Sequence, residues 1–302
     1  MTPGTDAPPL SVVLACRDPW PALRAALDAL YHQAAAARAE IVVAVARSDA
    51  RPPDAPTRYP GVLWTDVPGA SVFQLRAAAI ARARGAVVGL TEDHARVENG
   101  WCAAVLAAHA ERPDAAAVGG VVENASTDTL RDWASFLLAN GPAMRPLRPT
   151  RGEPISQQAN VSYKRRVLPA TFPPEGFMTL TFHEQLRRRG ERLVADERLV
   201  AHHDQALSLR AHSAGHFHNG RSIAGFRRAH LGRMGRLAYA AGCIALPAVM
   251  LVRTSRTVVS KRRNVGLAAA CVPWVVWLLL CHTAGELVGY VAGAGRSPHG
   301  VN

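Results

Sequence analysis

Several residue types and motifs are scarce or missing in this 302-residue chain. Lysine is almost absent, since Lys164 and Lys261 are the only two, and aromatic residues make up just 6% of the sequence. No Cys/His spacing of a zinc finger occurs, and no basic stretch is interleaved with aromatic residues. We therefore expect no nucleic acid among its partners. Neither a P-loop motif nor a G-x-G-x-x-G after the first predicted strand is present, which excludes two common nucleotide-binding fingerprints.

The cysteines and the N-terminus also lack familiar patterns. The five cysteines are scattered, odd in number and mostly within apolar runs. This pattern predicts buried free thiols in a reducing compartment rather than disulfides. Residues 1–9 are polar and rich in proline, without a basic stretch followed by an apolar one. We therefore expect no signal peptide and an N-terminal domain that stays in the cytoplasm.

What the chain does have is apolar bulk and positive charge. Hydrophobic residues make up 49% of it, and the net charge is +12 with a pI of about 10.5. The length allows one large domain or two ordinary ones. The basic excess, which is almost wholly arginine, favours anionic partners such as phosphates or lipid headgroups.

Short apolar runs alternate with amphipathic segments in the first 125 residues. This alternation predicts an α/β fold with a parallel sheet and right-handed crossovers. In such a sheet a nucleotide site is expected at the carboxyl ends of the strands. Region 124–154 is interpreted as irregular or partly helical. The expected strands are 10–16, 41–46, 62–64, 86–90 and 115–122.

The most distinctive stretch is Thr91-Glu92-Asp93-His94, which directly follows the predicted strand 86–90. Buried strands carry apolar residues, so charged side chains belong at the carboxyl end, where ligands bind. Carboxylates and imidazoles hold divalent cations, and carboxylates suit Mg²⁺ or Mn²⁺. Such a cation would hold a diphosphate. The alternative is an acidic, solvated turn without a ligand.

Together with this stretch, the order of motifs over residues 10–203 resembles that of family 2 glycosyltransferases. These enzymes have the GT-A fold and invert the configuration at the anomeric carbon of the transferred sugar. The tetrapeptide followed by Gly100-Trp101 resembles the metal-binding motif of that family, and Gln185-Leu186-Arg187-Arg188-Arg189-Gly190 resembles its "RLRRxG" helix. The other matching pieces are 11–18, 69–76, 118–120, 159–163 and 200–203.

The resemblance implies a mostly parallel GT-A sheet flanked by helices, with a divalent metal, Mg²⁺ or Mn²⁺, between the acidic motif and a nucleotide-sugar donor. The metal would neutralise the diphosphate leaving group. Two alternatives stay open: His94 packs instead of ligating, or His203 is a satisfied core histidine, with His202 as its structural neighbour. The implied metal ligands are Asp93, His94 and His203, and the implied donor contacts are Arg17, Asp18, Arg76 and Glu92.

The chain departs from the family pattern at two places. The second strand ends in residues 45–47, Val-Ala-Arg, where the family has an aspartate that reads the base. The catalytic base is the second departure, because Met178 and Thr179 occupy the aligned positions and neither can take a proton. Glu184 and Glu175 lie nearby and are the candidates to replace it. The alternative for Glu184 is an exposed helix residue paired with an arginine one turn away.

The last third of the chain changes character. Apolar segments at 237–252 and 265–293 predict membrane-associated helices, and the second is long enough to span a bilayer. The basic residues between them place that linker in the cytoplasm, so we expect the first segment not to cross fully. Arg221 and nearby arginines either contact a donor diphosphate or lipid phosphate, or form a membrane-surface face. The expected domains are a disordered lead-in (1–9), the glycosyltransferase domain (10–210), a basic juxtamembrane linker (211–236), membrane-associated helices (237–295) and a tail (296–302).

Three functions are compatible with this sequence. The first is a glycosyltransferase on the cytoplasmic face of a bacterial inner membrane, which moves a sugar to a lipid-linked or cell-envelope acceptor. The second is a non-catalytic GT-A domain that binds a nucleotide sugar and serves as a scaffold in an envelope assembly. The third is a nucleotidyltransferase-like enzyme, which the C-terminal apolar segments and the motif around Asn160 disfavour.

Overall fold

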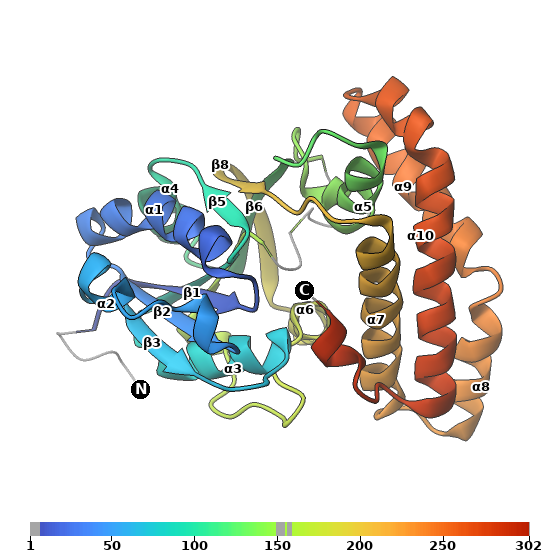
Figure 1. Cartoon of the computed structure of the whole chain (residues 1–302), viewed down its shortest axis with the longest axis horizontal. Helices are drawn as coiled ribbons and strands as arrows, with labels where there is room; N and C mark the ends of the chain where they lie inside the picture. The colour runs from blue at the N-terminus through green and yellow to red at the C-terminus, as the bar shows by residue number, and fades with distance from the viewer. Residues whose placement is uncertain (1–6, 149–154, 156–158, 302) are drawn as a thin grey trace. The chain divides into compact units, whose positions relative to one another are not determined.

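The computed structural model describes residues 7–148, 155 and 159–301. These residues form two compact units, which are described separately below. The first comprises Met1–Ala125 and Ala143–Asp204, and the second comprises Ser126–Pro142 and Gln205–Asn302. Figure 1 shows a sheet with flanking helices in the first unit and a bundle of helices in the second. Most of the expected lead-in and the end of the irregular region lie outside the described residues.

The first unit contains an eight-stranded mixed sheet with the order β3-β2-β1-β4-β7-β6-β8-β5. Four of the seven pairings between neighbouring strands are parallel, and β7 and β5 run antiparallel to their neighbours. The sheet is therefore parallel for much of its width, as the crossovers predict. The strands are β1 (Leu10–Cys16), β2 (Glu40–Val45), β3 (Leu63–Asp66), β4 (Val87–Glu92), β5 (Ala95–Val97), β6 (Ala115–Asn124), β7 (Val161–Lys164) and β8 (Arg192–His203).

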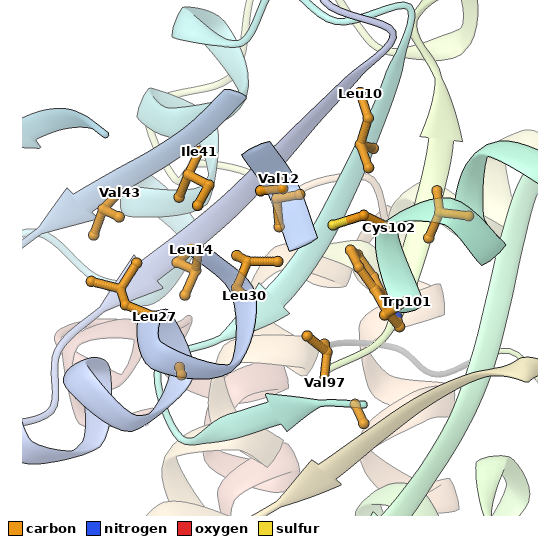
Figure 2. Close-up of a cluster of buried hydrophobic side chains, with 14 of the residues drawn as sticks. Leu10, Val12, Leu14, Leu27, Leu30, Ile41, Val43, Val97, Trp101 and Cys102 are labelled. Carbon is orange, nitrogen blue, oxygen red and sulfur yellow. The ribbon is translucent and has the colours of Figure 1, made fainter. Parts of the chain in front are cut away.

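Helices cover both faces of this sheet, which is why the central strands are almost continuously apolar. One face packs against α1 and α4 through a core that includes Leu14 of β1, Leu27 of α1 and Trp101 of α4 (Figure 2). Helix α3 contacts β1 and β2 and covers the other face. The helices of this unit are α1 (Trp20–Ala36), α2 (Ala55–Arg58), α3 (Val72–Arg82), α4 (Trp101–Glu111) and α6 (Thr179–Arg188), with short 3-10 turns η1 (Ser48–Ala50) and η3 (Arg165–Val167).

The second unit is helical in its described residues. Helix α10 packs against α5, α7, α8 and α9. By length and composition α10 can cross a membrane, and α8 and α9 meet the same criterion only when taken together, although the chain bends by 62° between them. Residues 211–236, interpreted from the sequence as a linker, form most of α7 and the start of α8. The helices are α5 (Leu130–Asn140), α7 (Leu209–Arg228), α8 (Arg233–Gly242), α9 (Leu246–Lys261) and α10 (Val265–Ala292); η2 (Gly141–Ala143) follows α5, and η4 (Ser297–Gly300) lies near the C-terminus.

Candidate metal and nucleotide site

The acidic tetrapeptide lies at the carboxyl end of β4, beside the end of β1. Strand β1 pairs with β2 on one side and with β4 on the other, so the connections diverge from β1. Open α/β sheets bind ligands in the crevice at such a switch point. Thr91, Glu92, Asp93 and His94 are each at most 7% exposed. That burial rules out the solvated turn considered from the sequence.

Asp93 joins the two strand ends. Its Oδ2 accepts hydrogen bonds from the backbone N–H groups of Arg17 and Asp18, each 2.9 Å long. Its Oδ1 lies 2.9 Å from Nδ1 of His94. Burial would raise the pKa of this carboxyl, but the hydrogen bond and charge of His94 and the two N–H donors lower it. Asp93 is therefore a carboxylate.

His94 lies among three carboxylates. Its Nδ1 is 2.9 Å from Oδ2 of Asp18 as well as from Asp93, and its Nε2 is 3.6 Å from Oε2 of Glu92. Burial would lower the pKa of the imidazole, but these hydrogen bonds and negative charges raise it well above its usual value. The ring also meets that of His203 edge-on, with centroids 4.8 Å apart. His94 thus balances one of the three negative charges as an imidazolium.

Glu92 lies between the guanidinium of Arg76 and the imidazoles of His94 and His203. Its Oε1 accepts a hydrogen bond of 3.0 Å from the guanidinium of Arg76, a buried residue of α3. Its Oε2 lies 3.5 Å from Nε2 of His203. Burial would raise the pKa of Glu92, but the bond to His203 and the charges of His94, His203 and Arg76 lower it to about 2. Arg76 therefore acts on the site through Glu92.

His203 reaches the site because β5 follows the tetrapeptide and pairs with the end of β8. In this antiparallel ladder His203 lies opposite Ala95, the residue after His94. Successive side chains of a strand point to opposite faces. His202 therefore points away, and its Nε2 lies 2.9 Å from Oε1 of Glu98 at the surface.

Two overlapping groups in this cluster have the geometry to hold a metal ion. One is Glu92, His94 and His203, and the other is Asp18, Asp93 and His94; within each group the ligand atoms lie within 4.8 Å of one another. The donors are carboxylate oxygens and imidazole nitrogens, a set that suits Mn²⁺ and, through its oxygens, Mg²⁺. The residues present therefore fit the cation that the family resemblance implies.

The residues near the expected base-reading position face solvent. Arg47, which follows β2, forms a two-pronged ion pair with Asp49, with bonds of 2.9 and 2.5 Å. Both side chains are more than half exposed. The resemblance predicts an aspartate at this position, and the chain instead has the ion pair of Arg47 and Asp49 just after β2.

The two candidates for the catalytic base lie in different surroundings. Glu175 is exposed on the loop before α6, and that loop is fixed to the start of α3: the N–H of Phe177 donates to the carbonyl of Phe73 over 2.8 Å. Gly176 has φ +94, and a Cβ there would lie 2.2 Å from the backbone of Phe73, so only glycine fits. Glu184 is partly buried within α6. The loop geometry therefore places Glu175, rather than Glu184, at the N-terminus of the helix that carries Arg76.

Two residues singled out from the sequence lie elsewhere. Arg221 belongs to α7 in the second unit, where its Nε donates to the carbonyl of Gly293 over 3.0 Å. Asn160 is fully buried. It accepts from the indole of Trp101 and donates to the carbonyls of Val121 and Leu199. Asn160 thus ties α4, β6 and β8 together, a role that its sequence context does not reveal.

Comparison with known proteins finds similar structures but no similar sequence. No protein-family description matches the chain, and no curated protein matches it in sequence. Among solved structures, a mannosyltransferase from Pyrobaculum calidifontis, in complex with GDP-Man and Mn2+, matches with a TM-score of 0.54 and 16% identity over 95% of this chain and 88% of that one. S. aureus TarS gives a TM-score of 0.48 and 12% identity over 92% and 90%. The first match shows that the chain has the fold of a glycosyltransferase.

Proposed function

We propose that the chain is a metal-dependent glycosyltransferase of the inverting, GT-A family 2 type. It would take a nucleotide-sugar donor and act on a lipid-linked or cell-envelope acceptor at the cytoplasmic face of a bacterial membrane. The observation that carries the proposal is the cluster of Asp18, Glu92, Asp93, His94 and His203, mostly buried, at the switch point of a glycosyltransferase-like sheet. The apolar helices of the second unit support the membrane attachment.

In this proposal Asp93, His94 and His203 would hold Mg²⁺ or Mn²⁺. The cation would replace the proton of His94, because a metal-ligating imidazole is neutral, and it would stabilise the negative charge of the departing nucleoside diphosphate. Arg17 and Asp18 lie on the turn after β1, where the donor would contact the chain. Arg76 fixes Glu92, and Glu92 in turn orients the imidazole of His203. These side chains would contribute to catalysis by holding charged groups in fixed positions near the leaving group.

Glu175 is the better-placed base in this scheme, because its loop is anchored beside the helix that carries Arg76. Its task would be to accept the proton of the acceptor hydroxyl. Glu184 is the second candidate. Replacing each glutamate separately with glutamine distinguishes the two, since only loss of the base would stop transfer while donor binding persists.

The proposal is tested by donor hydrolysis with the purified full-length protein. A panel of UDP-, GDP- and dTDP-sugars would be screened with Mn²⁺ or Mg²⁺ and again with a chelator. We expect release of one nucleoside diphosphate that depends on the metal and falls by roughly a hundredfold or more in Asp93→Asn. Glu98→Gln, which removes a carboxylate at the surface pair with His202, is the matched control. Release that persists in chelator would contradict the mechanism.

A second function has one specific observation in its favour. Met178 and Thr179, at the positions aligned with the family's catalytic base, are both buried and lack a carboxylate. A domain without a base would bind a nucleotide sugar and act as a scaffold of an envelope assembly. Metal-dependent donor binding without release, even with membrane lipids and acceptors supplied, would favour this alternative.

A further inference from the structure

Helices α8 and α9 expose an apolar surface to solvent. No residue of α8 is buried. The most exposed of its apolar neighbours is Ile244, which is 88% exposed and lies in the bend between the two helices. Apolar side chains this exposed and this close together mark a surface that has a partner. The exposed large apolar residues of this stretch are Met234, Leu237, Tyr239, Ile244, Val249 and Val252.

This apolar stretch is too short and too bent to cross a bilayer. Helix α8 is about 15 Å long and the apolar first half of α9, residues 246–252, about 10 Å, at 1.5 Å per residue. Their axes differ by 62°, so the two ends lie closer together than the summed length. A hydrocarbon core is about 30 Å thick. Arginines flank the stretch at both ends, at Arg233 and Arg236 and at Arg253 and Arg256.

Helix α10 is long enough to span, but it cannot be separated from α7. A Cβ on Gly220 of α7 would lie 2.1 Å from the carbonyl oxygen of His282, and one on Gly285 of α10 would lie 2.0 Å from that of Phe217. The indole of Trp277 donates to Ser213 over 2.9 Å, and Arg227 donates to the hydroxyl of Tyr290 over 2.6 Å. The two helices run parallel, since contacts progress from Ser213 with Trp277 to Arg227 with Tyr290, and α7 thus covers one side of the second half of α10.

Helix α7 is too polar for lipid. Within twenty residues it carries the arginines Arg210, Arg221, Arg227 and Arg228 as well as three histidines. Arginine in the middle of a membrane helix costs at least about 3 kcal/mol. A spanning α10 would take this helix into the hydrocarbon with it. Away from α7, by contrast, α10 exposes one apolar stripe along its length, with Trp277 at the edge of the α7 contact: Val265, Val272, Val276, Trp277, Leu280, Leu287 and Val291.

The charge of the chain is concentrated in the same region. Residues 205–302 hold 12 of the 35 basic residues but only one of the 23 acidic residues, Glu286, so they account for 11 of the 12 net positive charges. Glu286 is buried beside His282. The exposed surface of this segment is therefore apolar and cationic. That combination is complementary to an anionic lipid leaflet, which offers both hydrocarbon and phosphate groups.

We propose that the second unit docks in the plane of an anionic leaflet and does not cross the bilayer. The apolar bend around Ile244 inserts into the hydrocarbon region, and the apolar stripe of α10 lies along the interface. The flanking arginines bind lipid phosphates. Both ends of α10 then stay on one side of the membrane. This inference rests on the membrane attachment in the proposed function, but its readouts do not involve turnover, so its failure leaves glycosyl transfer untouched.

The topology is tested in sealed inverted inner-membrane vesicles from bacteria that express the full-length protein. One protease site would be placed between α9 and α10, at residues 262–264, and another after the C-terminus. In-plane docking predicts that both sites are cut from the outside without detergent. Protection of either site until detergent is added would show a crossing helix and overturn the proposal.

The lipid contacts are tested by co-flotation with phosphatidylcholine vesicles, with and without phosphatidylglycerol. Ile244→Asp should weaken binding at least about tenfold. Ser255→Asp, which adds the same charge at an exposed position of α9, should have a smaller effect. The pair Arg253→Gln and Arg256→Gln should abolish the preference for phosphatidylglycerol, whereas Arg38→Gln with Arg82→Gln, both exposed in the first unit, should not. Equal effects of each variant and its control, or no lipid preference in the unaltered protein, would overturn the proposal.

Discussion

At the scale of single residues, the main feature of the site is how its clustered carboxylates are neutralised. Asp18, Glu92 and Asp93 bring three carboxylates together, and the protein balances them with the guanidinium of Arg76 and the imidazolium of His94. Each carboxylate also has hydrogen-bond donors, which is what makes buried charge tolerable. The same carboxylate oxygens are the ligands that a divalent cation prefers.

Arg76 gives the first prediction at this scale. Arg76→Met leaves Glu92 with one partner fewer in a buried position, and breaking a buried ion pair costs about 3 to 5 kcal/mol. Urea unfolding of the purified variant measures the loss. The matched control is Arg82→Met on the same helix, an exposed position where about 0.5 kcal/mol or less is expected. If the two variants are equally stable, Arg76 does not neutralise Glu92. Adding Glu92→Gln to Arg76→Met should restore part of the loss.

Residues of the site differ in how far the sequence predicts them. Asp93 and His94 stand out because charged side chains directly after an apolar strand need a reason to be there. The partner of Glu92 does not stand out, because Arg76 is one of 33 arginines in the chain and nothing local marks it as buried. Asn160 is the clearest limit: nothing in its neighbourhood distinguishes an amide that binds a ligand from one that bonds to three segments of the chain.

At the scale of elements, the close contact between α7 and α10 depends on glycine. Gly220→Ala would place a methyl group 2.1 Å from the carbonyl oxygen of His282, so the helices must separate. Gly215→Ala, five residues earlier on α7, meets nothing within 4 Å. Alanine favours a helix interior by about 1 kcal/mol over glycine. We therefore expect Gly215→Ala to raise the thermal midpoint and Gly220→Ala to lower it, measured by circular dichroism in lipid vesicles. Shifts of the same sign would contradict the packing.

Element boundaries follow the sequence where a single physical signal dominates. The apolar run 10–16 is predicted as a strand and forms β1 with the same bounds. Strand β5 is missed because three residues are too few to show an alternating pattern. Helix α7 is interpreted as a linker because its arginines and histidines hide the small residues that face α10. The bend between α8 and α9 comes just before Pro247, which lies in the first turn of α9 and cannot continue a helix from α8; an apolar count alone predicts one continuous segment.

At the scale of the whole molecule, the first unit should be sensitive to mild acid. Burial is the main cause that lowers the pKa of His109 to about 4 and of His183 to about 3, helped by the charges of Lys164 and Arg187. Both rings are neutral in the fold and bind protons more readily when unfolded, at about pH 6.5. Their contribution is complete above that pH and is lost as the pH falls from about 6.5 toward 4.

Urea unfolding at neutral pH and at about pH 5.5 measures this loss, which should be about 1 kcal/mol for each histidine. The double variant His109→Gln and His183→Gln should lose less stability over the same interval than the unaltered protein. His32→Gln, at an exposed position of α1, serves as the control and should keep the full dependence. An unchanged dependence in the double variant would show that these two rings do not set it.

The chain combines a segment with nearly balanced charge, residues 1–204, and a C-terminal segment, residues 205–302, with almost all of the net charge. Residues 1–204 hold 23 basic and 22 acidic residues, whereas the rest holds 12 and one. This division follows from the sequence, as does the α/β class. The sheet order does not, because it depends on long-range pairings such as β7 between β4 and β6, which no local pattern specifies.

The most direct test of the central claim is Mn²⁺ binding in the presence of a nucleoside diphosphate, followed by electron paramagnetic resonance of the free ion. We predict one tight Mn²⁺ per chain that binds more strongly with the nucleotide, and loss of that binding in Asp93→Asn but not in Glu98→Gln. This outcome would place metal and diphosphate together at the buried cluster. Equal Mn²⁺ binding by both variants, or none by the unaltered protein with any nucleoside diphosphate, would contradict a metal-dependent transferase.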